Sequence, residues 1–270
     1  MSITCACRLF GVTRAGYYAW RARPLSAHAQ QDRVLQEHIA RVFAAHDGRY
    51  GAPRIHHALT EAGVPVSRRR VARLMRAAGL QGKAVRGYRS RRGVHRFYEQ
   101  QPNLVHRVRA PAPNQIWVGD ITYLAVADHW CYLTVILDQC SRRVLAWTLT
   151  RQRDATVTQH VLNAAVARRH PPAGLIFHSD RGSEYLAARY RDRLRQLGIR
   201  QSANTGGPGD NAHMESFFHT LKAEVTRGLI FATDHALRTL LRRYLRYYNR
   251  ERAHSALGFQ SPVEYEAHAA

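Results

Sequence analysis

Apolar positions at helical spacing dominate the first third of the chain. They predict three helices, over Asp32–Ala45, Pro53–Ala62 and Arg68–Ala78. Proline is favoured in the first turn of a helix, as in the second of these, and Ser67 is a favoured cap for the third. The three helices predict a helix-turn-helix module over 31–81, preceded at 1–30 by a remnant of a helical segment.

A mixed pattern of strands and helices begins near residue 114. It predicts three consecutive strands joined by short turns, then two further strands alternating with three helices, an order of βββαβαβα over 114–230. The predicted elements are strands Gln115–Val126, Trp130–Leu137 and Arg143–Thr150, helix Ala155–Arg169 capped by Asp154, strand Leu175–His178, helix Glu184–Leu197, strand Ile199–Ala203 and a helix carrying Glu215. A basic amphipathic helix, His235–Arg250, follows within 231–270.

Three acids lie in separate apolar settings of this second part. Asp120 lies within the first strand, Asp180 lies where the fourth strand gives way to a loop, and Glu215 opens a helix. A carboxylate on a largely buried strand is costly unless it is paired or bound to a metal. Convergence of the three would suit Mg²⁺ or Mn²⁺ and a two-metal phosphoryl-transfer site. The alternative is that each acid caps a helix or pairs with one of the 41 basic residues.

The charge balance points to a polyanionic partner. A net charge of +22 and a pI near 11.0 are typical of nucleic-acid binding, and 45% hydrophobic residues indicate a folded protein. No apolar run reaches the about 20 residues that span a bilayer, so we expect no membrane segment. The four cysteines have neither a Cys-x-x-Cys pair nor matching histidine spacing, which argues against zinc and fits a reducing cytoplasm.

The sequence motifs around the three acids resemble those of a known family, the OrfB-type insertion-sequence transposases with a retroviral-integrase-like (DDE) core. The matching segments are Trp117-Val118-Gly119-Asp120-Ile121-Thr122-Tyr123, His178-Ser179-Asp180-Arg181-Gly182-Ser183, Asp210-Asn211-Ala212-His213-Met214-Glu215-Ser216-Phe217-Phe218, Tyr247-Tyr248-Asn249 and His254-Ser255-Ala256-Leu257-Gly258. Gly48-Arg49-Tyr50-Gly51-Ala52-Pro53-Arg54-Ile55 resembles the family's helix-turn-helix module. Together with the element order, this implies an α/β, ribonuclease-H-like core behind an all-α module.

The resemblance implies that Asp120, Asp180 and Glu215 bind two Mg²⁺ ions and catalyse cleavage and strand transfer of DNA ends. The implied partners are terminal inverted repeats, target DNA, further copies of the chain and an upstream-frame (OrfA) product, in the bacterial cytoplasm at the nucleoid. One departure is visible: 34 residues separate Asp180 from Glu215, one fewer than usual, with the shortening in the glycine-rich segment 204–209. We expect that segment to be mobile without DNA.

Several other residues have two interpretations. Asp138 is a rival acid, which we assign to a turn, and Glu184 is suited to the start of its helix. His178 shares a strand face with Asp180. Lys222 lies two turns beyond Glu215 on the same helical face and is expected to contact phosphate, unless it is a surface lysine paired with Glu224.

Arginines are expected to supply the remaining DNA contacts. The candidates are four arginines of the third helix, Arg68, Arg69, Arg70 and Arg73, and one of the second helix, Arg54. A solvated helix that touches only phosphates is the alternative to a recognition helix. The basic stretch 82–113 is expected to be a linker along DNA. Two other functions remain open: a catalytically inactive DNA-binding protein or repressor, and a nuclease for RNA–DNA hybrids.

Overall fold

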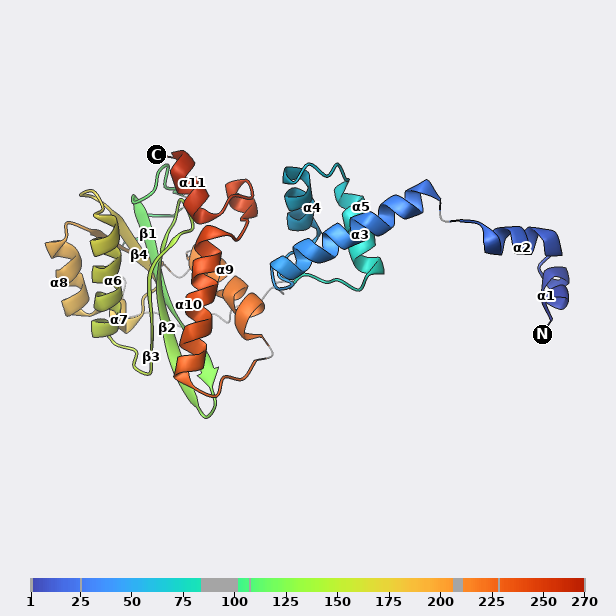
Figure 1. Cartoon of the computed structure of the whole chain (residues 1–270). Coiled ribbons are helices and arrows are strands. Elements are labelled where there is room, and N and C mark those ends of the chain that lie inside the picture. The colour runs from blue at the N-terminus through green and yellow to red at the C-terminus, as the bar shows by residue number, and fades with distance from the viewer. Residues whose placement is uncertain are drawn as a thin grey trace. The chain divides into compact units, whose positions relative to one another are not determined.

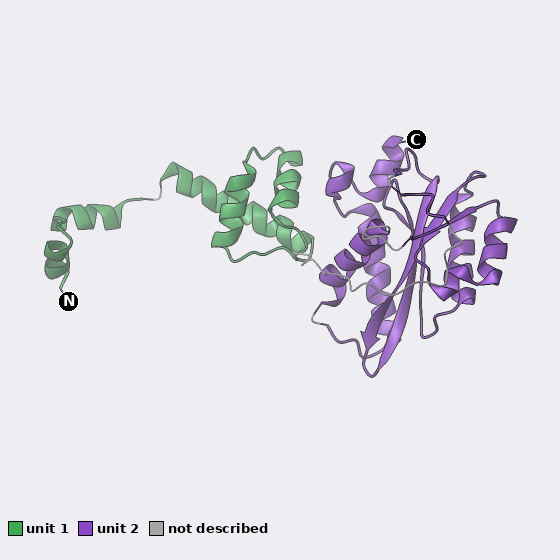
Figure 2. Ribbon diagram, turned by 180° about the vertical axis from the view of Figure 1, so that it is seen from behind, with its two compact units in different colours: residues 1–83 green, residues 84–270 purple. Residues whose placement is uncertain are grey.

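The computed structural model describes residues 2–24, 26–83, 102–106, 108–205, 211–227 and 229–269. They form two compact units, residues 1–83 and 84–270 (Figure 2). Most of the expected linker, from 84 to 101, lies outside the described residues, as does segment 206–210 of the glycine-rich loop. No helix among the described residues is both long enough and apolar enough to cross a membrane.

The first unit is entirely helical. Its helices are α1 (Ile3–Leu9), α2 (Arg14–Ala22), α3 (Ala27–Ala45), α4 (Ala52–Glu61) and α5 (Arg68–Ala77). The last three contact one another around buried apolar side chains that include Ile39, Ile55 and Leu74. Ser67 caps α5 as predicted, because its hydroxyl accepts from the Arg70 N–H at 3.2 Å.

The predicted start of α3 at Asp32 was wrong. The helix begins five residues earlier, because the Ser26 hydroxyl accepts from the Ala29 N–H at 3.2 Å and caps it. The added turn has few apolar positions, so it carries no helical periodicity that the sequence could display.

The second unit is built on one five-stranded sheet with the order β3-β2-β1-β4-β5. Its strands are β1 (Ile116–Val126), β2 (His129–Asp138), β3 (Val144–Thr150), β4 (Ile176–Ser179) and β5 (Arg200–Ala203). The first three pair antiparallel, whereas β4 lies parallel to both β1 and β5. This is the predicted three-strand meander followed by parallel βα units.

Helices cover both faces of this sheet (Figure 1). They are α6 (Ala155–Arg169), α7 (Ser183–Leu186), α8 (Ala188–Gln196), α9 (Ala212–Leu221), continued by a π-helical turn at Lys222–Thr226, α10 (Asp234–Arg250), a 3₁₀ turn at Ser255–Leu257 and α11 (Pro262–Ala269). Trp117 and Phe177 pack with α6, α7 and α8, while Val118 and Leu133 pack with α9 and α10. Because side chains alternate between the two faces along β1, the core has two layers, one on each face of the sheet. The buried side chains of α10 belong to one of these layers.

The single predicted helix Glu184–Leu197 was wrong, because it breaks at Ala187 into α7 and α8. Tyr185 and Tyr190 both pack against Phe177, with their own ring centroids 5.5 Å apart. Side chains five residues apart on one α-helix point about 140° away from each other. The break lets both rings enter the same core.

The closing segment, residues 251–269, is tied into the second unit by one buried ion pair and two partly buried ones. Arg252 binds the carboxylate of Glu224, with its Nη2 2.7 Å from Oε1, and the Tyr244 hydroxyl donates to the same carboxylate at 2.9 Å. In α11, Glu266 accepts from Arg169 at 2.8 Å and also pairs with Arg143. These contacts give a structural reason for a segment whose role the sequence alone did not explain.

Candidate active site

Two of the three predicted acids end up side by side. In the parallel pairing of β1 with β4, Gly119 lies opposite Ser179. The next residue on each strand is the acid, Asp120 on β1 and Asp180 just beyond β4. Gly119 permits the close approach, since a Cβ there would lie 2.5 Å from the Phe177 ring. The sheet register therefore brings together two carboxylates that are 60 positions apart in sequence.

The electrostatics of this pair are unfavourable without a cation. Burial, and then repulsion from Asp180, raise the pKa of Asp120 to about 8, against a weaker opposing effect of the Ile121 N–H. Asp180 accepts from the Gly182 N–H at 3.0 Å. Asp120 is thus largely protonated near neutral pH until a positive charge arrives.

A further acid, Glu184, adjoins the pair, although its sequence position suggested only a helix start. Its side chain is 4% exposed, and its carboxylate accepts from Arg153, with Nη2 at 2.7 Å and Nε at 2.8 Å. Its charge also raises the pKa of Asp120, whereas that of Arg153 lowers it. Arg153 therefore compensates part of a three-carboxylate cluster. No local sequence pattern distinguishes such a residue from a helix-capping glutamate.

Gly182 lies at the centre of this cluster. A Cβ at this position would be 2.7 Å from Oε1 of Glu184 and 3.0 Å from Oδ1 of Asp180. The backbone conformation there is ordinary, so glycine is needed for space and not for a left-handed φ. The loop after β4 thereby holds both carboxylates close to the main chain.

The third predicted acid, Glu215, lies in the first turn of α9 and is exposed. Its helix is attached to β1 beside the acids, because Asn211, which begins α9, donates from Nδ2 to the Gly119 carbonyl at 3.4 Å. The Glu215 N–H in turn donates to the Asn211 carbonyl at 3.1 Å. This places the first turn of α9 next to the strand that carries Asp120, while the Glu215 carboxylate pairs with no other described residue.

Lys222 approaches the same region from the far end of α9. Its ammonium lies 4.8 Å from the centre of the Tyr123 ring on β1. Burial lowers its pKa, and the charge of Asp120 partly reverses that effect. The alternative pairing of Lys222 with Glu224 was wrong, because Glu224 is buried and bound to Arg252 and Tyr244.

The rival residues have structural roles. Asp138 forms the predicted turn: Oδ1 accepts from the N–H groups of Cys140 and Ser141 at 2.9 and 3.0 Å, and Oδ2 accepts from Asn114 at 2.7 Å. His178 is fully buried, with Nδ1 2.8 Å from the hydroxyl of Ser202 on β5. Neither lies in the carboxylate cluster.

The candidate DNA-contacting arginines differ in what they already bind. Arg70 and Arg73 of α5 both pair with Asp32 of α3, at 2.7 and 2.6 Å, which joins two helices of the first unit. Arg54 lies over the Tyr50 ring. Arg68 and Arg69 are exposed and pair with no acid among the described residues, so their guanidinium groups remain available.

The donor set at the acids fits a hard divalent cation. Asp120 and Asp180 repel each other in a partly buried place, and Arg153, whose charge lowers the pKa of Asp120, is bound to Glu184. The buried Tyr185 hydroxyl also has no hydrogen-bond partner among the described residues. Carboxylate oxygens with a deficit of positive charge favour Mg²⁺ or Mn²⁺ over softer metals.

Family models agree with this architecture. Integrase core domain models match residues 110–207 and 197–262, and an HTH-like domain model matches residues 29–88. The sheet, the paired acids and these matches define a DDE-type polynucleotidyl transferase, a class that binds DNA and depends on a divalent metal. The relatives narrow the class: the chain belongs to the insertion-sequence transposases.

Two relatives match over nearly their whole length. The transposase for insertion sequence element IS904 of Lactococcus lactis subsp. lactis (strain IL1403) is 36% identical over 250 residues, which cover 90% of this chain and 97% of the relative. Transposase InsF for insertion sequence IS3A of Escherichia coli (strain K12) is 36% identical over 274 residues, which cover 98% of this chain and 94% of the relative.

A solved structure agrees on the fold. The cryo-electron microscopy structure of the simian T-cell lymphotropic virus intasome, in complex with the PP2A regulatory subunit B56 gamma, matches with a TM-score of 0.51 and 18% identity. The match covers 79% of this chain and 74% of that chain. The predicted ribonuclease-H-like fold is confirmed.

Proposed function

We propose that Asp120, Asp180 and Glu215 together bind two Mg²⁺ ions, or Mn²⁺ in their place, for end cleavage and strand transfer of the element's DNA. The observation that carries the proposal is the placement of Asp120 and Asp180 on adjacent parallel strands. When bound, the ions would supply positive charge to the attacking and leaving oxygens of a phosphodiester. Water or a DNA 3′-hydroxyl is the attacking group, and no covalent protein–DNA intermediate is needed.

The chain's own residues prepare this site. Asp120 must lose its proton before it can act as a ligand, because its pKa of about 8 keeps it neutral in the metal-free protein. Glu215 completes the acid set from the first turn of α9, which Asn211 holds against β1. Arg153 holds Glu184 beside the pair, and the half-buried Lys222 is placed to contact a DNA phosphate.

DNA binding is proposed to involve both units. Arg68 and Arg69 of α5, with Arg70, Arg73 and Arg54 nearby, would contact the terminal inverted repeats, and the core would contact target DNA. We further propose that several copies assemble on the DNA and that an upstream-frame (OrfA) product adds binding. The expected place of action is the cytoplasm, at the nucleoid.

A strand-transfer assay on labelled duplexes carrying the element's ends tests the proposal. The wild type should act with Mg²⁺ and not with EDTA, and Asp120→Asn and Glu215→Gln should lower the rate by at least about 10³-fold. Asp192→Asn is the control, since this exposed acid of α8 forms an ion pair with the equally exposed Arg195. Binding of the ends without nicking, even with the OrfA product added, would instead support an inactive DNA-binding protein or repressor.

A further inference from the structure

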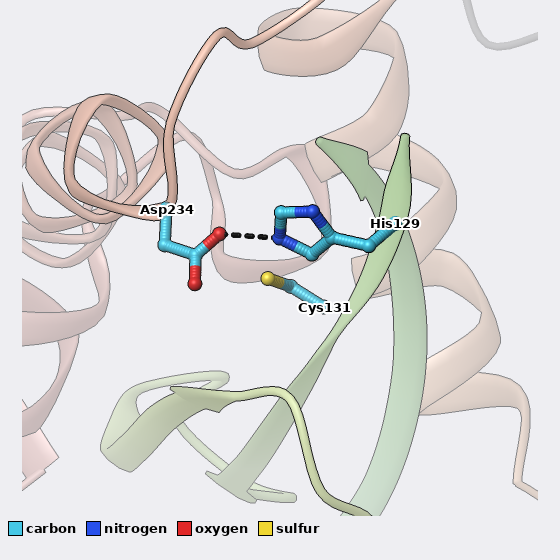
Figure 3. A group of neighbouring side chains, drawn as sticks. All are labelled: His129, Cys131 and Asp234. Carbon is cyan, nitrogen blue, oxygen red and sulfur yellow. Dashed lines mark hydrogen bonds and ion pairs between the residues drawn. The ribbon is translucent and has the colours of Figure 1, made fainter. Parts of the chain in front are cut away.

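Three side chains of metal-binding type converge away from the acids (Figure 3). They are His129 and Cys131 on β2 and Asp234 at the start of α10. One ligand atom from each lies within 4.8 Å of the others. On the sheet, Cys131 lies opposite Leu124, whereas Asp120 lies opposite Val135, so the cluster is four residues further along both strands.

The backbone holds these residues together. His129 and Cys131 are two positions apart on a strand and therefore share a face. The segment before α10 is bound to the β1–β2 turn, because the Ala127 N–H donates to the Phe231 carbonyl at 2.8 Å and Val126 bridges to Phe231. Thr233 caps α10 and sets the direction of its first turn, which carries Asp234.

One ring nitrogen of His129 and one carboxylate oxygen of Asp234 already bind residues outside the cluster. The other nitrogen and the other oxygen, the inner atoms, face each other. His129 uses Nδ1 for the Asp128 carboxylate at 3.2 Å, and Asp234 uses Oδ2 for Arg151 Nε at 2.6 Å. The inner atoms, His129 Nε2 and Asp234 Oδ1, are 2.6 Å apart. A histidine whose far nitrogen binds a carboxylate is the usual arrangement at protein metal sites.

We propose that His129 Nε2, Cys131 Sγ and Asp234 Oδ1 form a zinc site that clamps the start of α10 to the β1–β2 hairpin. A thiolate, an imidazole and a carboxylate together suit Zn²⁺ and do not suit Mg²⁺. Three protein ligands leave the fourth tetrahedral position to water. This inference does not depend on the proposed function of the acids.

In the metal-free protein, a proton lies where the zinc ion would bind. A proton shared between His129 and Asp234 occupies the position of the cation, and zinc binding releases it together with the thiol proton of Cys131. Tetrahedral ligands at zinc are about 3.3 Å apart, so the two side chains need to separate by less than about 1 Å. Both are about 29% exposed, which allows that movement and admits the ion from solvent.

Cobalt substitution of the full-length protein tests this site. Co²⁺ bound to a thiolate gives a near-ultraviolet charge-transfer band, which the oxygen ligands of Asp120 and Asp180 do not produce. One equivalent of Co²⁺ should give this band in the wild type, and Zn²⁺ should displace it. Cys131→Ser should remove the band completely, whereas Cys140→Ser, at the end of the same strand, should keep it.

His129→Gln gives a second test at a more exposed position. It should weaken Co²⁺ binding by at least about 10-fold while the far-ultraviolet circular dichroism stays that of the wild type. Absence of the band in folded wild-type protein with several equivalents of Co²⁺ would overturn the proposal. Its persistence in Cys131→Ser would do the same. Either result would leave His129 and Asp234 as a hydrogen-bonded ion pair only.

Discussion

At the scale of single residues, the decisive property of Asp120 is its unfavourable environment. It lies beside Asp180 and Glu184, and burial raises its pKa to about 8. Asp138, which is fully buried in the same sheet, accepts several hydrogen bonds from the main chain. In the metal-free protein the first acid carries a cost in stability, whereas the second holds a turn.

Replacing Asp120 should stabilise the metal-free protein. At neutral pH the metal-free protein must protonate Asp120 in order to bury it beside Asp180, and Asp120→Asn avoids that cost, so a gain of about 1 kcal/mol is expected. Mg²⁺ should raise the melting temperature of the wild type and not that of the variant. Asp138→Asn is the contrasting control, because its amide cannot accept at every position and a loss of about 1–3 kcal/mol follows. Equal destabilisation by both would contradict the assignment.

Removing Arg153 should shift the pH dependence of catalysis. The Arg153 charge lowers the pKa of Asp120, so Arg153→Gln raises it above about 8. A proton on this carboxylate competes with the metal, so a higher pKa means that activity is lost at a higher pH as the pH falls. The acidic limb of the strand-transfer profile should therefore move to higher pH. Arg189→Gln, an exposed arginine of α8 bound to Gln159, should leave it in place.

At the scale of elements, α5 divides its arginines between two tasks. Arg70 and Arg73 hold Asp32 and so join α5 to α3. Arg68 and Arg69 pair with no acid in the described part of the chain and lie at the exposed start of the helix, where the dipole also favours an anion. The same basic helix thus stabilises its module and, as we propose, offers two charges for DNA.

The two free arginines should carry a measurable share of DNA binding. Substituting both, Arg68→Ala with Arg69→Ala, should lower the slope of log affinity against log salt by about 2, because about one counterion is released per phosphate contact. Fluorescence anisotropy with labelled duplex at several salt concentrations measures this slope. Arg195→Ala, an exposed arginine of α8, is the matched control. An unchanged slope in the double variant would exclude α5 from the interface.

At the scale of the whole molecule, the second unit is closed by its own C-terminal segment. The buried pair between Arg252 and Glu224 joins the end of α10 to the π-helical turn after α9, and Glu266 joins α11 to α6. The acid-bearing sheet and the C-terminal helices therefore form one cooperative body. Its stability depends on residues far in sequence from the catalytic acids.

Breaking the Arg252 pair should destabilise this body strongly. Arg252→Gln leaves the Glu224 carboxylate buried without its cation, and a loss of about 3–5 kcal/mol is expected. Urea unfolding followed by circular dichroism measures it. Arg250→Gln, an exposed arginine at the end of the same helix, should change stability by less than about 0.5 kcal/mol. If the two variants unfolded at the same urea concentration, Arg252 would not be a structural anchor.

The sequence by itself determined the order of the elements in the core and two helix caps, and it singled out three acids as candidate ligands. Local caps such as Asp154 and Ser67 are short-range properties, so α6 and α5 were predicted to within one residue. The sequence motifs around Asp120, Asp180 and Glu215, which resemble those of the family, are equally short-range. These features depend on residues within one turn or one strand of each other.

The tertiary structure decided which distant side chains meet. Glu184 lies in the first turn of α7 as expected, but it is also part of the acid cluster. Glu224 was a possible surface partner of Lys222 and is instead the buried partner of Arg252. The spacing of cysteines and histidines gave no sign of zinc, yet α10 brings Asp234 to His129 and Cys131. Such contacts depend on strand register and helix packing, which no local pattern specifies.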